Sequence, residues 1–453
     1  MQEGGDSLGL FFLTCYTAIT CAITIRSIIK KKNIIYCALW CEYALSAVFC
    51  VFCKVYQADL VGFSTLHNRW YDLSDTTWWG YFLIIVCNLI AFKPFEVFDH
   101  GSSLGSMGKR KGAKQYMSFY AYIYILLAFV FIIFAFDNIR NILGISDLGA
   151  LRSSLYGNSD NESILVITNN FIANLCYKLC TQFKYMSIFV ALLMFKERHR
   201  VKTAVGLLVM TFAIYYIYAS ANAARGGLLI FVFCSFLMIL AFFKYMSGGS
   251  KRKLIILCSV CCALVVSFFF AVTMSRVATD TGGGNLLLRN ISFYLGHGPI
   301  EFSKITGSLE NFAYGETIIG RLMNHYFGTA YSWEHIQSEI GYPDIGPVFI
   351  TYLGYIYTDF GIFSCIGFTW TWSFFMCRWL KKPKLHISTI FIFMYYLSFY
   401  VTGNFAVGRL EYAGLITAHI IALIIRLIEE QLRIRTRRNS LPYVCGDSVY
   451  EKR

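Results

Sequence analysis

A set of arginines lies at or near the ends of the long apolar segments of this 453-residue chain. The guanidinium group stays charged at every physiological pH and binds phosphate oxygens through two parallel hydrogen bonds. An arginine-lined cavity would therefore suit a ligand that carries a pyrophosphate. The alternative is that each arginine pairs with a nearby carboxylate or a lipid headgroup. The set comprises Arg140, Arg152, Arg225, Arg276, Arg289, Arg321 and Arg409.

Arg225 stands out within this set because it lies in the sequence AARGGLL, directly before an apolar segment. The glycines Gly226 and Gly227 would let a ligand approach the backbone, and the N-terminus of a helix attracts anions. The competing interpretation is a tight turn between helices, whose arginine reaches to the membrane interface. Both interpretations stay open from the sequence.

Acid–base chemistry could come from the polar stretch 275–361, which holds histidines and carboxylates among many aromatic residues. A histidine can accept a proton from a hydroxyl group near neutral pH, although a structural role is the competing interpretation for each one. No spacing typical of a metal site occurs, so we predict neither a metal nor another cofactor. The predicted bases are His325, His335 and Glu334, chosen from a wider group that includes His297, Glu339, Asp344 and Asp359.

The elements that must position these residues are apolar segments. Hydrophobic residues make up 57% of the chain and charged residues 15%, against about half and about a quarter in soluble domains. Runs of about 20 apolar residues predict an all-α polytopic membrane protein. The net charge of +14 is spread over short connections, which argues against a nucleic-acid-binding protein. Most of the 16 cysteines lie in apolar runs, where they are expected to be small core residues.

Eleven apolar segments are predicted to be transmembrane helices. They are 8–29, 34–53, 78–92, 117–136, 176–195, 203–220, 227–246, 254–274, 362–380, 387–401 and 411–427. When alternate connections are assigned to opposite sides, with the N-terminus outside, Lys and Arg gather on the inner side and the outer side is net negative. The positive-inside rule therefore predicts an extracytoplasmic N-terminus and a cytoplasmic C-terminus.

This topology divides the chain into four parts. They are 1–274, with helices one to eight and outer loops at 54–77 and 137–175; a large outer loop, 275–361; 362–432, with helices nine to eleven; and a cytoplasmic tail, 433–453. The hydrophobic end of the large loop, 347–359, is too short to cross and predicts a helix that dips into the outer leaflet. Charges inside spans are costly, so we predict that Glu42 pairs with Lys178 or Lys184.

Three short sequences carry a resemblance to a known family: ALRSSLY at 150–156, AARGGLL around Arg225, and FITYLGYIYTDFGIFSCIGF at 349–368. Together with about eleven spans and a large late outer loop, they resemble the O-antigen polymerases, which are bacterial membrane enzymes that extend lipid-linked oligosaccharide repeat units. The resemblance implies a fold similar to the membrane-embedded glycosyltransferases of the GT-C type. It also implies that arginines of the outer loops bind the pyrophosphates of two lipid substrates.

The expected function is therefore that of an O-antigen polymerase at the periplasmic face of the bacterial inner membrane. It would transfer a growing glycan from undecaprenyl pyrophosphate to the terminal hydroxyl of a new lipid-linked repeat unit, with a chain-length regulator and a flippase as partners. Two alternatives stay open, an O-antigen ligase and a lipid-linked oligosaccharide flippase or transporter. The residues expected to bind pyrophosphate are Arg152, Arg225, Arg276, Arg289, Arg321 and Arg409.

Overall fold

The computed structural model describes residues 2–55, 73, 75–98, 113–143, 170–221, 225–243, 245–279, 286–309, 311–320, 351–382, 386–404 and 409–440. Within these ranges the regular elements are helices, and no strand occurs. The helices are α1 (Gln2–Ile29), α2 (Ile34–Val55), α4 (Trp78–Ala91), α5 (Lys93–Val97), α7 (Ala113–Phe134), α8 (Phe136–Leu143), α10 (Phe171–Gln182), α11 (Lys184–Lys196), α12 (Val201–Ala221), α13 (Arg225–Phe243), α14 (Gly248–Thr279), α15 (Leu286–Ser308), α18 (Gly354–Leu380), α19 (Ile387–Thr402) and α20 (Arg409–Ser440).

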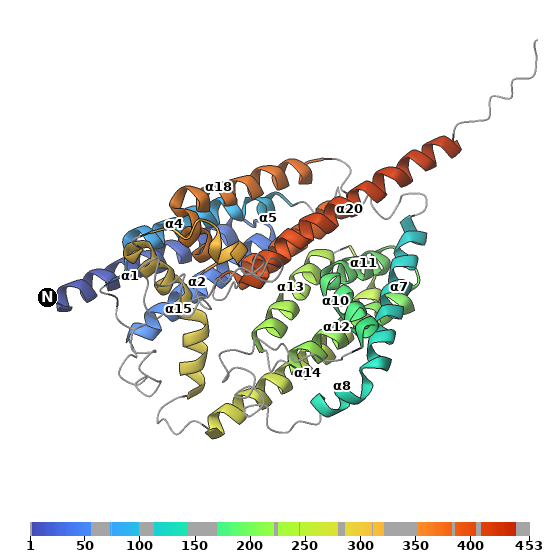
Figure 1. Cartoon of the computed structure of the whole chain (residues 1–453), viewed down its shortest axis with the longest axis horizontal. Coiled ribbons are helices and arrows are strands. Elements are labelled where there is room, and N and C mark those ends of the chain that lie inside the picture. The colour runs from blue at the N-terminus through green and yellow to red at the C-terminus, as the bar shows by residue number, and fades with distance from the viewer. Residues whose placement is uncertain are drawn as a thin grey trace, which may run out of the picture.

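Figure 1 shows the helices as one bundle, with the N-terminus and the C-terminal end of α20 at opposite ends. Each of the eleven predicted spans overlaps a helix or a helix pair. Among the described helices, six are long and apolar enough to cross a membrane, and seven if α10 and α11 count as one broken span. α13 and α19 add shorter apolar helices, Gly227–Phe243 and Ile387–Thr402. The prediction of an all-helical membrane protein is confirmed at this level.

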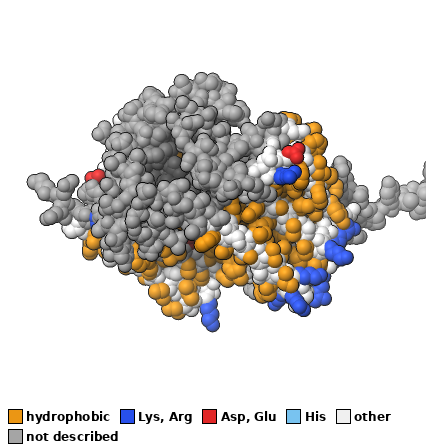
Figure 2. All heavy atoms as spheres, turned by 90° about the horizontal axis from the view of Figure 1, so that it is seen from below, with side chains coloured by type: hydrophobic (Ala, Val, Ile, Leu, Met, Phe, Trp, Pro, Cys, Tyr) orange, Lys and Arg blue, Asp and Glu red, His pale blue; other side chains and the backbone are white. Residues whose placement is uncertain are grey.

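Large apolar side chains face outward along several helices. On α7, Phe119, Leu126 and Ile133 are 64%, 62% and 67% exposed, and their seven-residue spacing places them on one stripe of the helix. Figure 2 shows hydrophobic side chains over much of the described face, with Lys and Arg mainly along one of its edges. Such an apolar surface would be an interaction site in water, and in a membrane it contacts lipid.

The predicted straight span 176–195 is instead two helices, α10 and α11, which are bent by 61°. A break inside a membrane leaves carbonyl groups that need hydrogen-bond donors. Tyrosine hydroxyls of α7 and α19 supply these donors: Tyr124 to Cys180 O over 3.1 Å, Tyr395 to Gln182 O over 2.7 Å, and Tyr120 to Phe183 O over 3.3 Å. The bend is therefore stabilised by side chains of neighbouring helices.

α18 is also broken, close to its start. Gly361 has φ 74° and ψ −164°, so the short helical stretch 354–360 meets the rest of α18 at a kink. A side chain at this position would be strained, and an added Cβ would lie 2.9 Å from the ring of Phe312. The segment predicted to dip into the membrane, 347–359, is described from residue 351, and it consists of a turn and this first part of α18.

The cores of α4, α18 and α19 meet through aromatic side chains. Trp372 stacks on Tyr396 with ring centroids 3.6 Å apart, and its Nε1–H donates to Ala91 O over 2.9 Å. Phe95 packs against Phe393 with centroids 4.9 Å apart. These contacts fix α18 and α19 against α4 and against α5, which carries Phe95, so the position of the broken start of α18 is set by the bundle.

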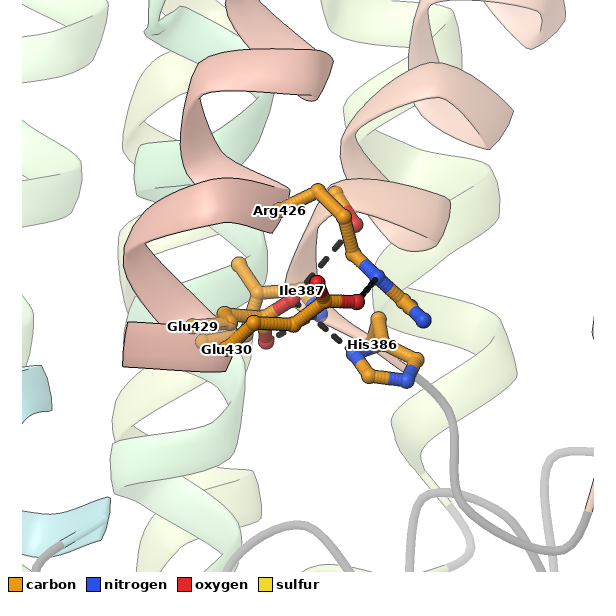
Figure 3. Close-up of polar contacts among 6 residues, drawn as sticks. His386, Ile387, Arg426, Glu429 and Glu430 are labelled. Carbon is orange, nitrogen blue, oxygen red and sulfur yellow. Dashed lines mark hydrogen bonds and ion pairs between the residues drawn. The ribbon is translucent and has the colours of Figure 1, made fainter. Parts of the chain in front are cut away.

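At the other end of α19, a carboxylate of α20 caps the helix (Figure 3). Glu429 Oε1 accepts the backbone N–H of Ile387 over 2.9 Å, and its Oε2 accepts the hydroxyl of Ser388 over 3.4 Å. His386 Nδ1 lies 3.2 Å from the same Oε2. The neighbouring Glu430 accepts from Arg426 Nε within α20 over 2.7 Å. Glu429 thus joins two helices, whereas the partner of Glu430 among the described residues, Arg426, lies on the same helix.

We expect Glu429→Ala to lower the free energy of unfolding by about 1–2 kcal/mol, because it removes an N-terminal cap and leaves an N–H donor without its acceptor. Thermal denaturation of the full-length protein in detergent measures the effect. Glu430→Ala is the matched control and should cost at most about 0.5 kcal/mol, since its ion pair is exposed. Equal losses for the two variants would contradict the capping role.

Candidate functional site

The structure leaves most of the predicted site residues without a described side chain. Arg152, Arg321, His325, Glu334 and His335 lie outside the described residues, as do Glu339 and Asp344. For Arg225, Arg276, Arg289 and Arg409 the helix backbone is described and the side chain is not. Arg225 opens α13, Arg276 is in the last turn of α14, Arg289 is in the first turn of α15, and Arg409 opens α20. The predicted pyrophosphate and base assignments therefore stay predictions.

Three segments that are far apart in the sequence meet at one place, which we call the α15–α18–α20 junction. It consists of the end of α15, the stretch 351–361 and the start of α20. The Tyr357 hydroxyl donates to Thr306 O over 3.3 Å. The Tyr352 backbone N–H donates to Gly403 O over 2.7 Å, and the Tyr412 hydroxyl donates to Tyr352 O. Arg409 begins the helix that enters this junction.

Asp359, one of the candidates for acid–base chemistry, has a structural role in the junction. Its Oδ1 accepts the backbone N–H of Thr317 over 3.0 Å, and its Oδ2 accepts that of Ile318 over 3.2 Å. The side chain is fully buried. Both carboxylate oxygens are thus used to hold the segment 313–320 against the start of α18, which fits a helix cap and not a base.

The large segment 275–361, predicted as an outer loop, contributes a helix to the bundle. α15 packs against α2 and α4. The Ser303 hydroxyl donates to Thr77 O over 2.7 Å, and the Thr77 N–H donates back to Ser303 Oγ over 2.9 Å. The hydroxyls of Thr77 and Thr306 lie 2.6 Å apart. These reciprocal bonds anchor the C-terminal half of α15 to the first turn of α4.

Glycines allow α15 to approach its neighbours this closely. A Cβ added at Gly80 of α4 would lie 2.4 Å from Ser303 Cα, and one added at Gly296 of α15 would lie 2.7 Å from the carbonyl carbon of Phe49. Real Cβ atoms do not make such short contacts with backbone. The helices therefore pack backbone to backbone, as small residues permit in membrane proteins.

This half of α15 carries three buried ionisable side chains. His297, Glu301 and Lys304 are 2%, 1% and 6% exposed. Their spacing of four and then three residues places them on one face of the helix. Lys304 Nζ lies 3.6 Å from Glu301 Oε1. Ionisable groups inside a membrane bundle are rare and usually functional or paired, so this charged face is the best-defined polar feature that the structure describes.

Polar hydroxyls lie close to the helices that carry this face. The rings of Tyr16 on α1 and Tyr81 on α4 lie 5.3 Å apart, and both residues are at most 2% exposed. The Tyr16 hydroxyl has no hydrogen-bond partner among the described residues, whereas the Tyr81 hydroxyl lies close to the side chains of Ser303 and Thr76. A buried hydroxyl normally has a hydrogen-bond partner, so the Tyr16 hydroxyl is available to bind water or a ligand.

The predicted acid–base candidates include His297 but neither Glu301 nor Lys304. The signal that could have found them is the pattern HGPIEFSK, in which His297, Glu301 and Lys304 repeat at helical spacing. The glycines and Pro299 disfavour a helix when read locally, yet the segment forms α15. Tertiary packing against α2 and α4 outweighs those local preferences.

The predicted pair of Glu42 with a lysine is wrong. Lys178 is exposed on α10, and Lys184 Nζ lies 4.4 Å from the ring centroid of Tyr215. Glu42 Oε2 is buried and has no hydrogen-bond partner among the described residues. The physical reason is the bend between α10 and α11, which places Lys184 over an aromatic face that stabilises its charge.

In the described part of the chain, no three His, Cys, Asp or Glu side chains are grouped so that they could hold a metal ion. In comparisons with protein-family models, with characterised proteins and with solved structures, none matches this chain.

Proposed function

We propose that this protein is a membrane glycosyltransferase that polymerises lipid-linked oligosaccharide repeat units, with eleven spans in a GT-C-like arrangement. The observation that supports the proposal best is the α15–α18–α20 junction. A short buried helix, 354–360, breaks there at Gly361, beside the helix that Arg409 begins. Broken helices at membrane depth are tolerated where they are buried in protein or line a cavity, and substrate sites are often built on them.

In this proposal the reaction is a displacement at the anomeric carbon of the donor glycan. The bond from that carbon to the undecaprenyl pyrophosphate breaks, and a new bond to the acceptor hydroxyl oxygen forms. One of His325, His335 or Glu334 takes the hydroxyl proton. Charge develops on the leaving pyrophosphate and is stabilised by arginines. Those arginines are Arg152, Arg225, Arg276, Arg289, Arg321 and Arg409.

The proposed location is the bacterial inner membrane, with the N-terminus periplasmic and the C-terminus cytoplasmic. The opposite placement of the two ends in Figure 1 is compatible with this orientation. A polyprenyl carrier presents its pyrophosphate at the lipid–water boundary, so a site at the outer end of the bundle would receive it directly. A chain-length regulator and a flippase would act on the same lipid-linked substrates.

We expect Arg225→Ala and Arg321→Ala to shift surface polysaccharide from long chains to single repeat units while protein levels stay normal. Each loses a phosphate contact that strengthens as the leaving group departs, a loss of about 100-fold or more in rate. Gel separation of lipopolysaccharide from complemented deletion strains measures the shift. Arg140→Ala is the matched control, because Arg140 is exposed on α8 and is not assigned to the site. Long chains from both site variants would refute the assignment.

A flippase is the second candidate, favoured by the ionisable groups Glu42 and Glu301 inside the bundle, since charge inside a membrane often marks a substrate path. The same deletion strain separates the classes. A polymerase deletion leaves single repeat units on lipid A–core, and a flippase deletion leaves none. A ligase deletion gives long chains that never reach lipid A–core.

A further inference from the structure

Two turns that are distant in the sequence contact each other at one end of the bundle. The first joins α11 to α12, and the second joins α13 to α14. The Ser250 hydroxyl donates to Phe195 O over 3.2 Å, and the hydroxyls of Ser247 and Ser250 lie 3.1 Å apart. Because Phe195 precedes Lys196 and Ser250 precedes Lys251, this contact brings the basic residues of the two turns together.

We call these residues the basic turn cluster. Its members are Lys196, Arg198, Arg200, Lys202, Lys251, Arg252 and Lys253. The one carboxylate in the two turns is Glu197, which lies 3.5 Å from Lys196. Most members are exposed, and Figure 2 shows Lys and Arg gathered along an edge of the apolar surface. The cluster therefore carries a concentrated positive charge that its own acidic residue does not neutralise.

Two members are held in an unfavourable backbone conformation. Arg198 has φ 49° and Arg200 has φ 43°, in the left-handed region that favours glycine. Arg200 also precedes the first turn of α12, where its carbonyl accepts from Ala204 N and where a positive charge opposes the helix dipole. Glycine would relieve the strain at both positions. Arg200 Nη1 donates to the Tyr122 hydroxyl over 2.7 Å, which helps to hold that arginine, whereas Arg198 keeps its positive charge at a position where the backbone conformation favours glycine.

The surface next to the cluster is apolar. On α14, directly after Lys253, Ile255, Ile256 and Val260 are 52%, 56% and 53% exposed. A soluble phosphate compound would gain nothing from these side chains. A phospholipid would satisfy both features, because its phosphate can meet the cations while its acyl chains cover the isoleucines.

We propose that the basic turn cluster binds the phosphate headgroup of an anionic phospholipid, whose acyl chains lie along the exposed face of α14. Juxtamembrane cations attract anionic lipid strongly enough that each contributes about a fivefold gain in affinity. Arginine adds bidentate phosphate contacts to this attraction. The inference is independent of the proposed catalytic function, since the cluster contains none of the residues assigned to that site.

The test uses the full-length protein in detergent, titrated with cardiolipin and followed by native mass spectrometry and by thermal denaturation. The wild type should bind cardiolipin and gain thermal stability. The variant Arg198→Gln/Lys202→Gln/Arg252→Gln/Lys253→Gln should bind it at least about tenfold more weakly. The control variant Arg26→Gln/Lys30→Gln/Lys381→Gln/Lys382→Gln removes four other exposed cations and should retain most of the affinity.

Three outcomes would overturn the proposal. One is equal weakening in the cluster variant and the control variant, which would mean diffuse attraction instead of a site. Another is undiminished cardiolipin binding by the cluster variant. The last is the same stabilisation by sodium pyrophosphate as by cardiolipin, which would assign the cluster to a soluble anion. Equal melting temperatures of the cluster variant and the wild type without added lipid confirm that the variant is folded.

Discussion

Gly80→Ala should destabilise the protein strongly, although alanine is the better helix former. The added Cβ would lie 2.4 Å from Ser303 Cα and 2.8 Å from Thr306 Oγ1. Because Ser303 Cα belongs to the backbone and cannot rotate away, α15 must move away from α4. Because this disrupts the bonds between Thr77 and Ser303, we expect a loss of about 3 kcal/mol in the free energy of unfolding. The melting temperature in detergent measures it.

Gly367→Ala is the control, and it should change stability in the opposite direction. Gly367 lies inside α18, and nothing stands within 4 Å of an added Cβ. Replacing a helical glycine in open space stabilises a helix by about 1 kcal/mol. A Gly80→Ala protein as stable as the wild type would mean that α15 does not pack against α4 as the structure has it.

α15 depends on close contacts with distant helices, and for this reason the sequence predicts the transmembrane helices but not α15. The apolar segments could be predicted because a run of about 20 apolar residues is typical of a helix that spans a membrane. Each predicted segment overlaps a helix in the structure. α15 has no such run. Its sequence LLLRNISFYLGHGPIEFSKITGS contains glycines and an internal proline, which favour a loop when read locally. Its place in the bundle depends on close approaches to distant segments: Gly80 of α4 leaves room for Ser303, and Gly296 of α15 leaves room for the backbone of α2.

The bend between α10 and α11 was hidden for a similar reason. Composition gives one apolar run from 176 to 195, and no proline or glycine interrupts it. The break depends on hydroxyl donors from α7 and α19, which are distant in sequence. The environment of the Lys184 ammonium group could not be predicted either, because the ring of Tyr215 reaches it only in the folded bundle.

For the candidate site, the residue types indicated which side chains could do chemistry, but they did not predict which role each side chain has in the fold. Asp359 was a reasonable candidate base by its chemistry, yet both of its oxygens accept backbone N–H groups. His297 was predicted as a single candidate, whereas its environment depends on Glu301 and Lys304 and on the helix that places all three on one face. The sequence predicted where charge is unusual, and the fold determines which charges face each other.

Lys304→Met should be among the most destabilising single changes in the chain. The substitution removes the cation 3.6 Å from Glu301, a carboxylate that is 1% exposed, and so leaves this buried carboxylate without that counter-charge. Breaking a buried ion pair from one side costs about 3–5 kcal/mol. Glu301→Leu should cost a similar amount, because it leaves Lys304 buried beside an apolar group. Thermal denaturation of each single variant in detergent measures these losses.

The double variant Glu301→Leu/Lys304→Met decides whether the two charges act as a pair. Removing both buried charges should cost less than removing either alone, since no charge then remains to be desolvated. The exposed pair Arg426 and Glu430, with N and O atoms 2.7 Å apart, is the reference cycle and should show a coupling of only about 0.3–0.5 kcal/mol. Additive losses at Glu301 and Lys304 would show that each charge is stabilised by other groups, and the charged face of α15 would then not be a unit.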